Sequence, residues 1–263
     1  MTPPMPVGHF DRPNVARVQD HLDGGTDHHA ADRDFARRLV AAAPWLPASI
    51  RTNRRHGPRV LDCLTRESGI DQVLDLGCGL PHDDNRHPPD AVHRIIYIDS
   101  DPAVDAHARM ILAERDGTDS LRADLTDMPA LLAAQPVAGL DRSRPVGVLL
   151  HDVLPWIDDE AAHTAMAALR TWLPSGSVLS LTHAASDTAP AAMAALTAHY
   201  ASAGIAFRPR TGQQIRHLLR SWKPVERGGL VTTASWRRPT PPHERLDHSH
   251  AYAVLASPGD HPT

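Results

Sequence analysis

The segment Val73-Leu74-Asp75-Leu76-Gly77-Cys78-Gly79 is the most informative part of the sequence: an apolar strand that carries one acidic residue and ends in a Gly-x-Gly turn. The first strand of a doubly wound α/β sheet ends in such a turn, because glycine lets the backbone approach a ligand where a Cβ would clash. A tight turn without a ligand would carry the same glycines. The assignment therefore depends on the segments that flank this stretch.

Strands and helices alternate after this stretch. The expected strands are 72–76, 94–98, 120–123, 145–150 and 176–181. The expected helices are 102–115, with apolar residues along one face, and 128–134, 158–172, 189–203 and 211–219. This alternation predicts an α/β fold with a mostly parallel, doubly wound sheet covered on both faces. Segments 230–236 and 250–256 are expected to close it as an antiparallel pair around the proline-rich 238–243 loop.

The residues before the first strand predict a helical N-terminal extension over 11–69, preceded by a disordered tail over 1–10. Its expected helices are 14–23, 30–43 and 47–64, and Gly57-Pro58 should kink or split the last of these. The Rossmann-like core follows over 70–263. Because no internal repeat and no linker interrupt the chain, we expect residues 11–263 to form a single domain.

The composition, with 41% hydrophobic and 22% charged residues, is ordinary for a soluble globular protein. A net charge of −4 leaves no basic excess for a phosphate backbone, which argues against a nucleic-acid partner. Two cysteines, Cys63 and Cys78, are too few for a disulfide framework and fit a reducing compartment. There is neither a signal-peptide pattern nor an apolar run of about 20 residues that would span a membrane. The sequence therefore predicts a cytoplasmic protein without a membrane partner.

A second acidic residue ends the next expected strand, Ile95-Ile96-Tyr97-Ile98-Asp99. It lies about 20 residues beyond the glycines, the spacing at which a carboxylate accepts hydrogen bonds from the ribose hydroxyls of a nucleoside. Asp101 instead fits the N-cap of the following helix, with Pro102 at its first position. A dinucleotide fingerprint would need a third glycine near position 82, where His82 stands. This argues against a nicotinamide-dependent oxidoreductase.

Taken together, these residues resemble the S-adenosylmethionine-dependent methyltransferase family that was once catalogued only as a domain of unknown function and is frequent in actinomycete-type bacteria. The resemblance covers nearly the whole chain and is most specific where Gly-Leu-Pro directly follows the Gly-x-Gly turn, within Leu74–Pro81. The other matching segments are Ala16–Asp20, Gly24-Gly25, Ala31–Arg33, Asn53-Arg54, Tyr97–Pro102, Asp141–Val146, Ser180–His183, Leu230-Val231 and Trp236-Arg237.

The resemblance implies a class I Rossmann-like fold with S-adenosyl-L-methionine as cofactor. In this class the acidic residue at the position of Asp75 helps to organise the loop around the cationic methionine moiety. The acidic residue after the third strand, here Asp124, binds the adenine amino group. The cofactor-binding residues that we expect are Asp75, Gly77, Cys78, Gly79, Asp99, Ser100, Asp124, Leu125, Gly24 and Gly25.

Methyl transfer needs in-line approach of the acceptor and, for a weakly acidic nucleophile, a base. We expect the acceptor beside the end of the fourth strand, where His151 could be the base and Asp152 could orient it or anchor the acceptor. His183, after the fifth strand, is a second candidate base. Either histidine could instead line the adenine edge or cap a turn.

A cluster of potential ligands invites a metal-site interpretation, but its spacing matches no established motif, and we expect no metal. The cluster consists of His82, Asp83, Asp84 and His87.

The chain also departs from the family pattern. His82 replaces the usual threonine, Pro88-Pro89 interrupts the helix that should follow, and Leu154-Pro155 replaces Leu-His. The leading hypothesis is a methyltransferase for a small-molecule or peptide acceptor. The alternative is a catalytically silent cofactor-binding or regulatory protein of the same fold. The acceptor and the oligomeric state stay open.

Overall fold

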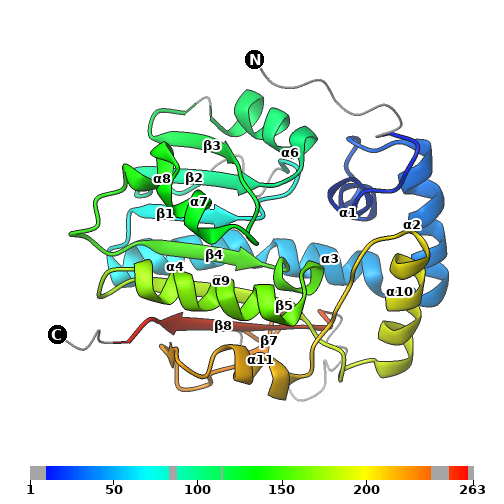
Figure 1. Ribbon diagram of the computed structural model, residues 1–263. Coiled ribbons are helices and arrows are strands. Elements are labelled where there is room, and N and C mark those ends of the chain that lie inside the picture. Colours follow the sequence, from blue (N-terminus) through cyan, green and yellow to red (C-terminus); the bar gives the residue numbers. More distant parts are fainter. Residues whose placement is uncertain (1–9, 83–87, 114, 238–248, 260–263) are drawn as a thin grey trace.

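The computed structural model describes residues 10–82, 88–113, 115–237 and 249–259 (Figure 1). They contain an eight-stranded sheet of order β3-β2-β1-β4-β5-β8-β6, with β7 paired to β8. The strands are β1 Gln72–Leu76, β2 Arg94–Asp99, β3 Thr118–Arg122, β4 Gly147–His151, β5 Val178–Ala184, β6 Lys223–Pro224, β7 Val231–Thr232 and β8 Ala251–Ser257. Strands β1 to β5 pair in parallel, and β8 pairs antiparallel to β5, β6 and β7. The predicted α/β class and mostly parallel sheet are confirmed.

Helices precede, connect and cover these strands. They are α1 Val15–Asp23, α2 Ala30–Ala42, α3 Leu46–Arg54, α4 His56–Ser68, α6 Pro102–His107, α7 Met128–Ala133, α8 Gln135–Ala138, α9 Asp159–Trp172, α10 Pro190–Ser202 and α11 Gly212–Leu218. A π-helical turn, η1 Ala108–Leu112, continues α6, and a 3-10 turn, η2 Leu154–Trp156, follows β4. No helix among the residues that the structure describes is long and apolar enough to cross a membrane.

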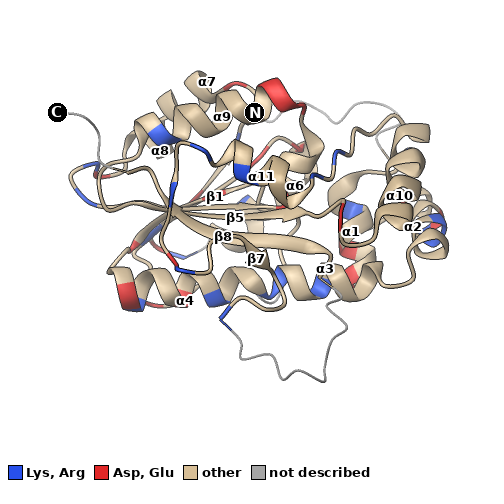
Figure 2. Cartoon of the chain, turned by 90° about the horizontal axis from the view of Figure 1, so that it is seen from below, with Lys and Arg blue, Asp and Glu red and all other residues tan. Residues whose placement is uncertain are grey.

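Each face of the sheet has its own hydrophobic core, because successive side chains of a strand point to opposite faces. Leu74, Leu76 and their neighbours in β2, β4 and β5 pack against α7, α9 and α11. Val73 and Ile95 pack on the other face, against α4 and η1. Figure 2 shows the sheet on edge, with α7, α8 and α9 on one side and α3 and α4 on the other.

The N-terminal helices form a third cluster at the carboxyl ends of the parallel strands. Phe35 and Leu39 of α2 are fully buried against Leu196 and Tyr200 of α10. In Figure 1, β1, β2 and β4 point toward α1, α2 and α10. The extension therefore covers the end of the sheet at which doubly wound folds bind ligands.

The break in the predicted 47–64 helix comes earlier than Gly57-Pro58. Helix α3 ends at Arg54 and α4 begins at His56, so Gly57 and Pro58 lie in the first turn of α4. Proline is tolerated in a first turn, because the first N–H groups of a helix have no intrahelical acceptor. The predicted split of this helix therefore occurs, but at Arg55 and not at Gly57-Pro58.

The predicted closing pair exists but is short. Only Val231–Thr232 of the expected 230–236 strand pairs with β8, and β6 was not predicted. Trp236 lies in a turn and packs beside the His56 ring, with centroids 4.7 Å apart. The expected loop 238–243 and residues 1–9 of the expected tail lie outside the described residues. The single-domain organisation stays a prediction.

Candidate functional site

The strand order reverses at β1, which lies between β2 and β4. Leu76, the last residue of β1, is in register with Ile98 on one side and Leu150 on the other. The loops after β1, β2 and β4 therefore leave the sheet side by side. Such a switch point is where open α/β sheets form their ligand crevice.

The turn after β1 is fixed by the end of β2. The Gly77 and Cys78 N–H groups donate to the Ile98 carbonyl at 2.7 and 3.1 Å, and the Gly79 N–H donates to Asp99 Oδ2 at 3.1 Å. Gly77 and Gly79 have φ of +70° and +66°, which disfavours any residue with a Cβ. A Cβ on Gly77 would also lie 2.4 Å from Val153 Cγ2, whereas the position of a Gly79 Cβ is open among the described residues.

Asp99 is held by the backbone around it. Its Oδ1 accepts from the Asp101 N–H at 2.9 Å, in addition to the Gly79 contact at Oδ2. Burial raises the pKa of the Asp99 carboxyl, and these N–H donors oppose that rise. Asp101 is the N-cap of α6, as predicted, and accepts from the Ala103 N–H at 2.7 Å. Asn14 Nδ2 donates to Asp101 at 2.6 Å, which ties the N-terminal extension to this loop.

Two adjoining cavities open at the strand ends. The first, which we call the β2 cavity, has a volume of about 660 Å³ and borders Gly79, Asp99, Ser100, Asp124 and Leu125. The second, which we call the β5 cavity, has a volume of about 150 Å³ and lies among β4, β5, α3 and α10. The residues that border both cavities are Gln19, Gly77, Gly79, His151, Asp152 and Trp156. These shared residues form the boundary between the two cavities, and we call this boundary the passage.

Asp152 occupies this passage in a conformation that is uncommon for a residue with a side chain. Its φ is +55°, and its N–H donates to the Thr182 carbonyl at 3.0 Å. Gln19 Nε2 donates to its carboxylate at 3.3 Å, and Trp156 Nε1 donates to its carbonyl at 2.7 Å. Burial raises the pKa of the Asp152 carboxyl to about 7. Backbone strain of this kind is concentrated at functional sites.

The Leu154-Pro155 departure from the family pattern forms part of this geometry. Pro155 lies within η2, which brings Trp156 back over the Asp152 carbonyl. His151 lies beside Asp152, with Nε2 2.8 Å from Ser180 Oγ. Burial lowers the pKa of His151 to about 4, so its ring is neutral at pH 7.

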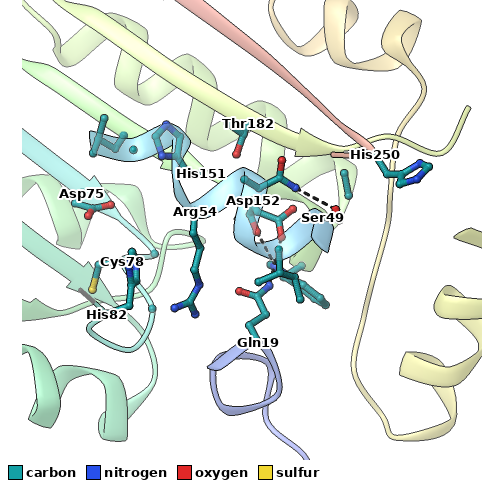
Figure 3. A pocket seen from close by; sticks show the side chains of 18 of the residues that line it. Gln19, Ser49, Arg54, Asp75, Cys78, His82, His151, Asp152, Thr182 and His250 are labelled. Atoms are coloured by element: carbon teal, nitrogen blue, oxygen red, sulfur yellow. Dashed lines mark hydrogen bonds between the residues drawn. The ribbon is translucent and has the colours of Figure 1, made fainter. Parts of the chain in front are cut away.

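On the other side of the glycine turn, Asp75 and Arg54 flank the β5 cavity (Figure 3). Burial and the charge of Asp99 raise the pKa of the Asp75 carboxyl to about 7. Cys78 also borders this cavity, and burial raises the pKa of its thiol well above the usual value. Arg54 Nη1 lies 3.3 Å from Asp23 Oδ2, and its side chain is 13% exposed. The site thus combines the carboxyls of Asp75 and Asp99 and the guanidinium of Arg54 around the glycine turn after β1.

The sequence interpretation missed Arg54 and Gln19 as site residues. Both lie in the N-terminal extension, and both line the β5 cavity. The signal was present, since Gln19 and Arg54 fall in two of the segments that carry the family resemblance. Their position beside the glycine turn depends on the packing of α1 and α3 on each other, which no local pattern encodes.

Three of the expected site residues, His183, Gly24 and Gly25, border neither cavity. His183 is fully buried, with Nδ1 2.9 Å from the Ala184 carbonyl and Nε2 2.8 Å from Arg210 Nη1. It points to the face of β5 opposite Thr182, because strand side chains alternate. Burial lowers its pKa to about 3, so it has the character of a neutral core histidine.

Gly24 and Gly25 end α1. Gly24 is the left-handed C-cap with φ of +99°, and a Cβ on Gly25 would lie 2.0 Å from Asp20 Oδ1. Both glycines are thus explained by the helix end and the tight turn that follows it.

Of the suggested metal cluster, Asp83, Asp84 and His87 lie outside the described residues. Within the described ranges, no group of three or more His, Cys, Asp or Glu side chains could hold a metal ion.

The strand order, the glycine turn after β1 and the carboxylate at the end of β2 define a class I Rossmann-like methyltransferase. The chain belongs to the S-adenosyl methyltransferase family, whose model matches residues 8–258. It is therefore an S-adenosylmethionine-dependent enzyme, and the predicted family, fold and cofactor are confirmed.

Solved structures agree with this assignment. A DUF574 family protein from Streptomyces avermitilis is 27% identical with a TM-score of 0.87, over 94% of this chain and 98% of that one. A candidate methyltransferase from Thermobifida fusca is 30% identical with a TM-score of 0.86, over 97% and 98%. The N-methyltransferase NodS from Bradyrhizobium japonicum, in complex with S-adenosyl-L-homocysteine, shares the fold at 15% identity and a TM-score of 0.50, over 85% and 96%. A search of curated proteins gave no match.

Proposed function

We propose that this enzyme binds S-adenosylmethionine in the β2 cavity and methylates a small molecule held in the β5 cavity. The observation that carries the proposal is the pair of cavities that meet at Gln19, His151, Asp152 and Trp156. The nucleoside needs only the β2 cavity, and the methionine end only the part of the β5 cavity beside the glycine turn, so the part of the β5 cavity between β5 and α10 is left for the acceptor. Its volume of about 150 Å³ favours a small molecule over a peptide chain.

The residues of the β2 cavity fit the nucleoside. The Asp99 oxygens accept the Gly79 and Asp101 N–H groups, and a carboxylate has about four acceptor positions in all, so it can still accept the ribose hydroxyls. Asp124 Oδ1 accepts from Thr126 N and Oγ1, both at 2.8 Å, which orients Oδ2 for the adenine amino group. The open position beside Gly79 lets its backbone approach the sugar. Ser100 and Leu125 also line the β2 cavity.

The methionine end of the cofactor fits the groups around the glycine turn. Asp75 is placed for the ammonium group, and Arg54 is placed for the carboxylate with the planar donor pair that carboxylates prefer. Asp23 neutralises Arg54 when the site is free. When bound, the cofactor supplies a methyl group on a sulfonium sulfur. The passage between the cavities, lined by Asp152 and Trp156, is where that methyl group would meet the acceptor.

The proposal is tested by calorimetry followed by turnover. Titration of the purified protein with S-adenosylmethionine, S-adenosylhomocysteine and NAD should show binding of the first two alone. Incubation with methyl-labelled cofactor and a metabolite extract should then transfer label to a small molecule. A protein that binds the cofactor but labels nothing over a broad extract would be the catalytically silent alternative. Affinity for NAD alone would refute the proposal.

We also propose that the N-terminal helices and the sheet form one domain in the cytoplasm. Gln19 and Arg54 of the extension complete the site, which supports the single domain. The free cysteines Cys63 and Cys78 fit a reducing compartment. A single cooperative unfolding transition of the whole chain, and its recovery in the cytoplasmic fraction, would be the expected results.

A further inference from the structure

The β5 cavity has an aromatic wall built from three separate elements. Trp156 of η2, Tyr200 of α10 and Phe207, in the loop after α10, contact each other, with ring centroids 4.8 to 5.1 Å apart. Trp45 stacks on His250, with centroids 3.8 Å apart, and both also line this cavity. Such a wall suits a flat or apolar body, and its ring faces attract a cation.

The same cavity contains three side chains with acceptor oxygens, Asp152, Thr182 and Asn53. The Asp152 carboxylate faces it together with Thr182, whose carbonyl receives the Asp152 N–H (Figure 3). Thr182 Oγ1 and Asn53 Oδ1 are shielded from solvent and have no hydrogen-bond partner among the described residues. Asn53 Nδ2 donates to the Ser249 carbonyl at 3.1 Å, which leaves its Oδ1 as the unpaired atom. Buried polar atoms without partners are uncommon in native structures, and a bound ligand can satisfy them.

We infer that the methyl acceptor is a small primary or secondary amine with an aromatic or apolar body, and that Asp152 is the base that frees its nitrogen. This inference deepens the proposed function and rests on it. An ammonium group can donate to the Asp152 carboxylate and keeps up to two further N–H groups for other acceptors, whereas a phenol or alcohol supplies one donor. A methyl acceptor that carries a carboxylate would face the Asp152 carboxylate without a free cation, since Arg54 is assigned to the carboxylate of the cofactor.

The proton and electron balance of the step needs only these groups. The Asp152 carboxylate takes one proton from the substrate ammonium, and the nitrogen lone pair becomes free. The nitrogen then bonds to the methyl carbon as the carbon–sulfur bond breaks, and that electron pair stays on sulfur. The product is a methylammonium ion and a neutral thioether. Asp152 afterwards releases its proton to solvent through the passage.

The backbone at Asp152 offers a matched variant. Its φ of +55° is tolerated best by Asn and Asp among residues with a side chain, so Asp152→Asn removes the charge and keeps the conformation. Asp34→Asn is the control, because Asp34 lies on α2 with its side chain 58% exposed. Urea unfolding of both variants would verify that each one folds.

The experiment compares acceptors that differ only in the reacting group. The first series is tryptamine, tryptophol and indole-3-acetate. The second series is phenethylamine, 2-phenylethanol, phenylacetate and 4-ethylphenol. Each compound is titrated into the enzyme saturated with S-adenosylhomocysteine. They are then assayed for methyl transfer by mass. We expect the amines to bind at least about tenfold more tightly than the neutral or anionic analogues, the range of a charge-assisted hydrogen bond. Asp152→Asn should abolish that preference and lower amine turnover at least about 100-fold, the scale of general-base catalysis.

The outcomes separate this inference from the proposed function. If S-adenosylhomocysteine binds but alcohols or acids are preferred, or if no amine of the panel binds to this complex, the amine inference is overturned and cofactor binding stands. If Asp152→Asn keeps the preference for amines and their turnover, the role of Asp152 is overturned. If S-adenosylhomocysteine itself does not bind, the proposed function fails first.

Discussion

Three glycines with left-handed backbones allow two effects of a glycine-to-alanine substitution on stability to be separated: the strain of the backbone conformation and the steric overlap of the new methyl group with its neighbours. Gly69, Gly77 and Gly79 have φ of +61°, +70° and +66°. Among the described residues, a Cβ on Gly69, which ends α4, or on Gly79 meets nothing within 4 Å, but a Cβ on Gly77 meets Val153 at 2.4 Å. Each alanine substitution should therefore lower the free energy of unfolding through the left-handed backbone, and only Gly77→Ala should lower it further through steric overlap.

The magnitudes follow from these contacts. The left-handed conformation costs a residue with a Cβ about 1–2 kcal/mol, so Gly69→Ala and Gly79→Ala should lose about that much stability. Overpacking costs a further 1–3 kcal/mol or so, which brings Gly77→Ala to about 2–5 kcal/mol. Urea unfolding would measure these losses. Calorimetry with S-adenosylhomocysteine should show that Gly69→Ala binds normally, while Gly79→Ala, whose methyl group fills open space beside the sugar, binds at least about tenfold more weakly.

Two results would refute this reasoning. Equal stability losses for Gly69→Ala and Gly77→Ala would mean that the contact with Val153 does not constrain the turn. Unchanged cofactor affinity in Gly79→Ala would mean that the open position beside Gly79 is not where the nucleoside lies.

Three further predictions concern single side chains. Methyl transfer should rise with pH through about 7, because the Asp152 carboxyl with its raised pKa is protonated and inactive as a base below that value, and a flat profile in kcat/KM would contradict this. Arg54→Gln should weaken S-adenosylmethionine binding about 10- to 100-fold and leave 5′-methylthioadenosine, which has no carboxylate, unaffected; equal losses for both ligands would exclude a carboxylate contact. His183→Ala should lower stability by about 1–3 kcal/mol, since it leaves buried Arg210 Nη1 without that partner, and should not change S-adenosylhomocysteine affinity; a loss of affinity at unchanged stability would return His183 to the site.

The elements that could be predicted from the sequence are those whose signal is local. The Val73–Gly79 pattern places apolar residues on a buried strand and glycines at positive φ, so one segment predicts both the strand and the turn. Asp99 is found by its distance from that turn, and the structure joins it to Gly79 directly. Asp101 and Pro102 mark the start of α6 for the same local reason.

The parts that escaped prediction depend on contacts between distant segments. The aromatic wall brings Trp156, Tyr200 and Phe207 together from three positions, none of which carries a pattern that points to a cavity. Strand β6 exists only because Lys223–Pro224 pairs with β8, and two residues have no periodicity to detect. His183 was predicted as a candidate base because, like His151, it follows a run of strand residues. The alternation of side chains along β5 instead turns it to the face opposite Thr182, away from the β5 cavity.

The most direct test of the account is calorimetric titration of S-adenosylhomocysteine into the unmodified protein and Asp99→Ala, with Asp34→Ala as the surface control. Asp99 is assigned both ribose hydroxyls, and hydrogen bonds to a charged acceptor contribute about 1.5–3 kcal/mol each, so the variant should bind at least about tenfold more weakly while the control is unchanged. If the unmodified protein does not bind S-adenosylhomocysteine, or if Asp99→Ala binds it equally well, the nucleoside does not lie where the glycine turn and Asp99 place it.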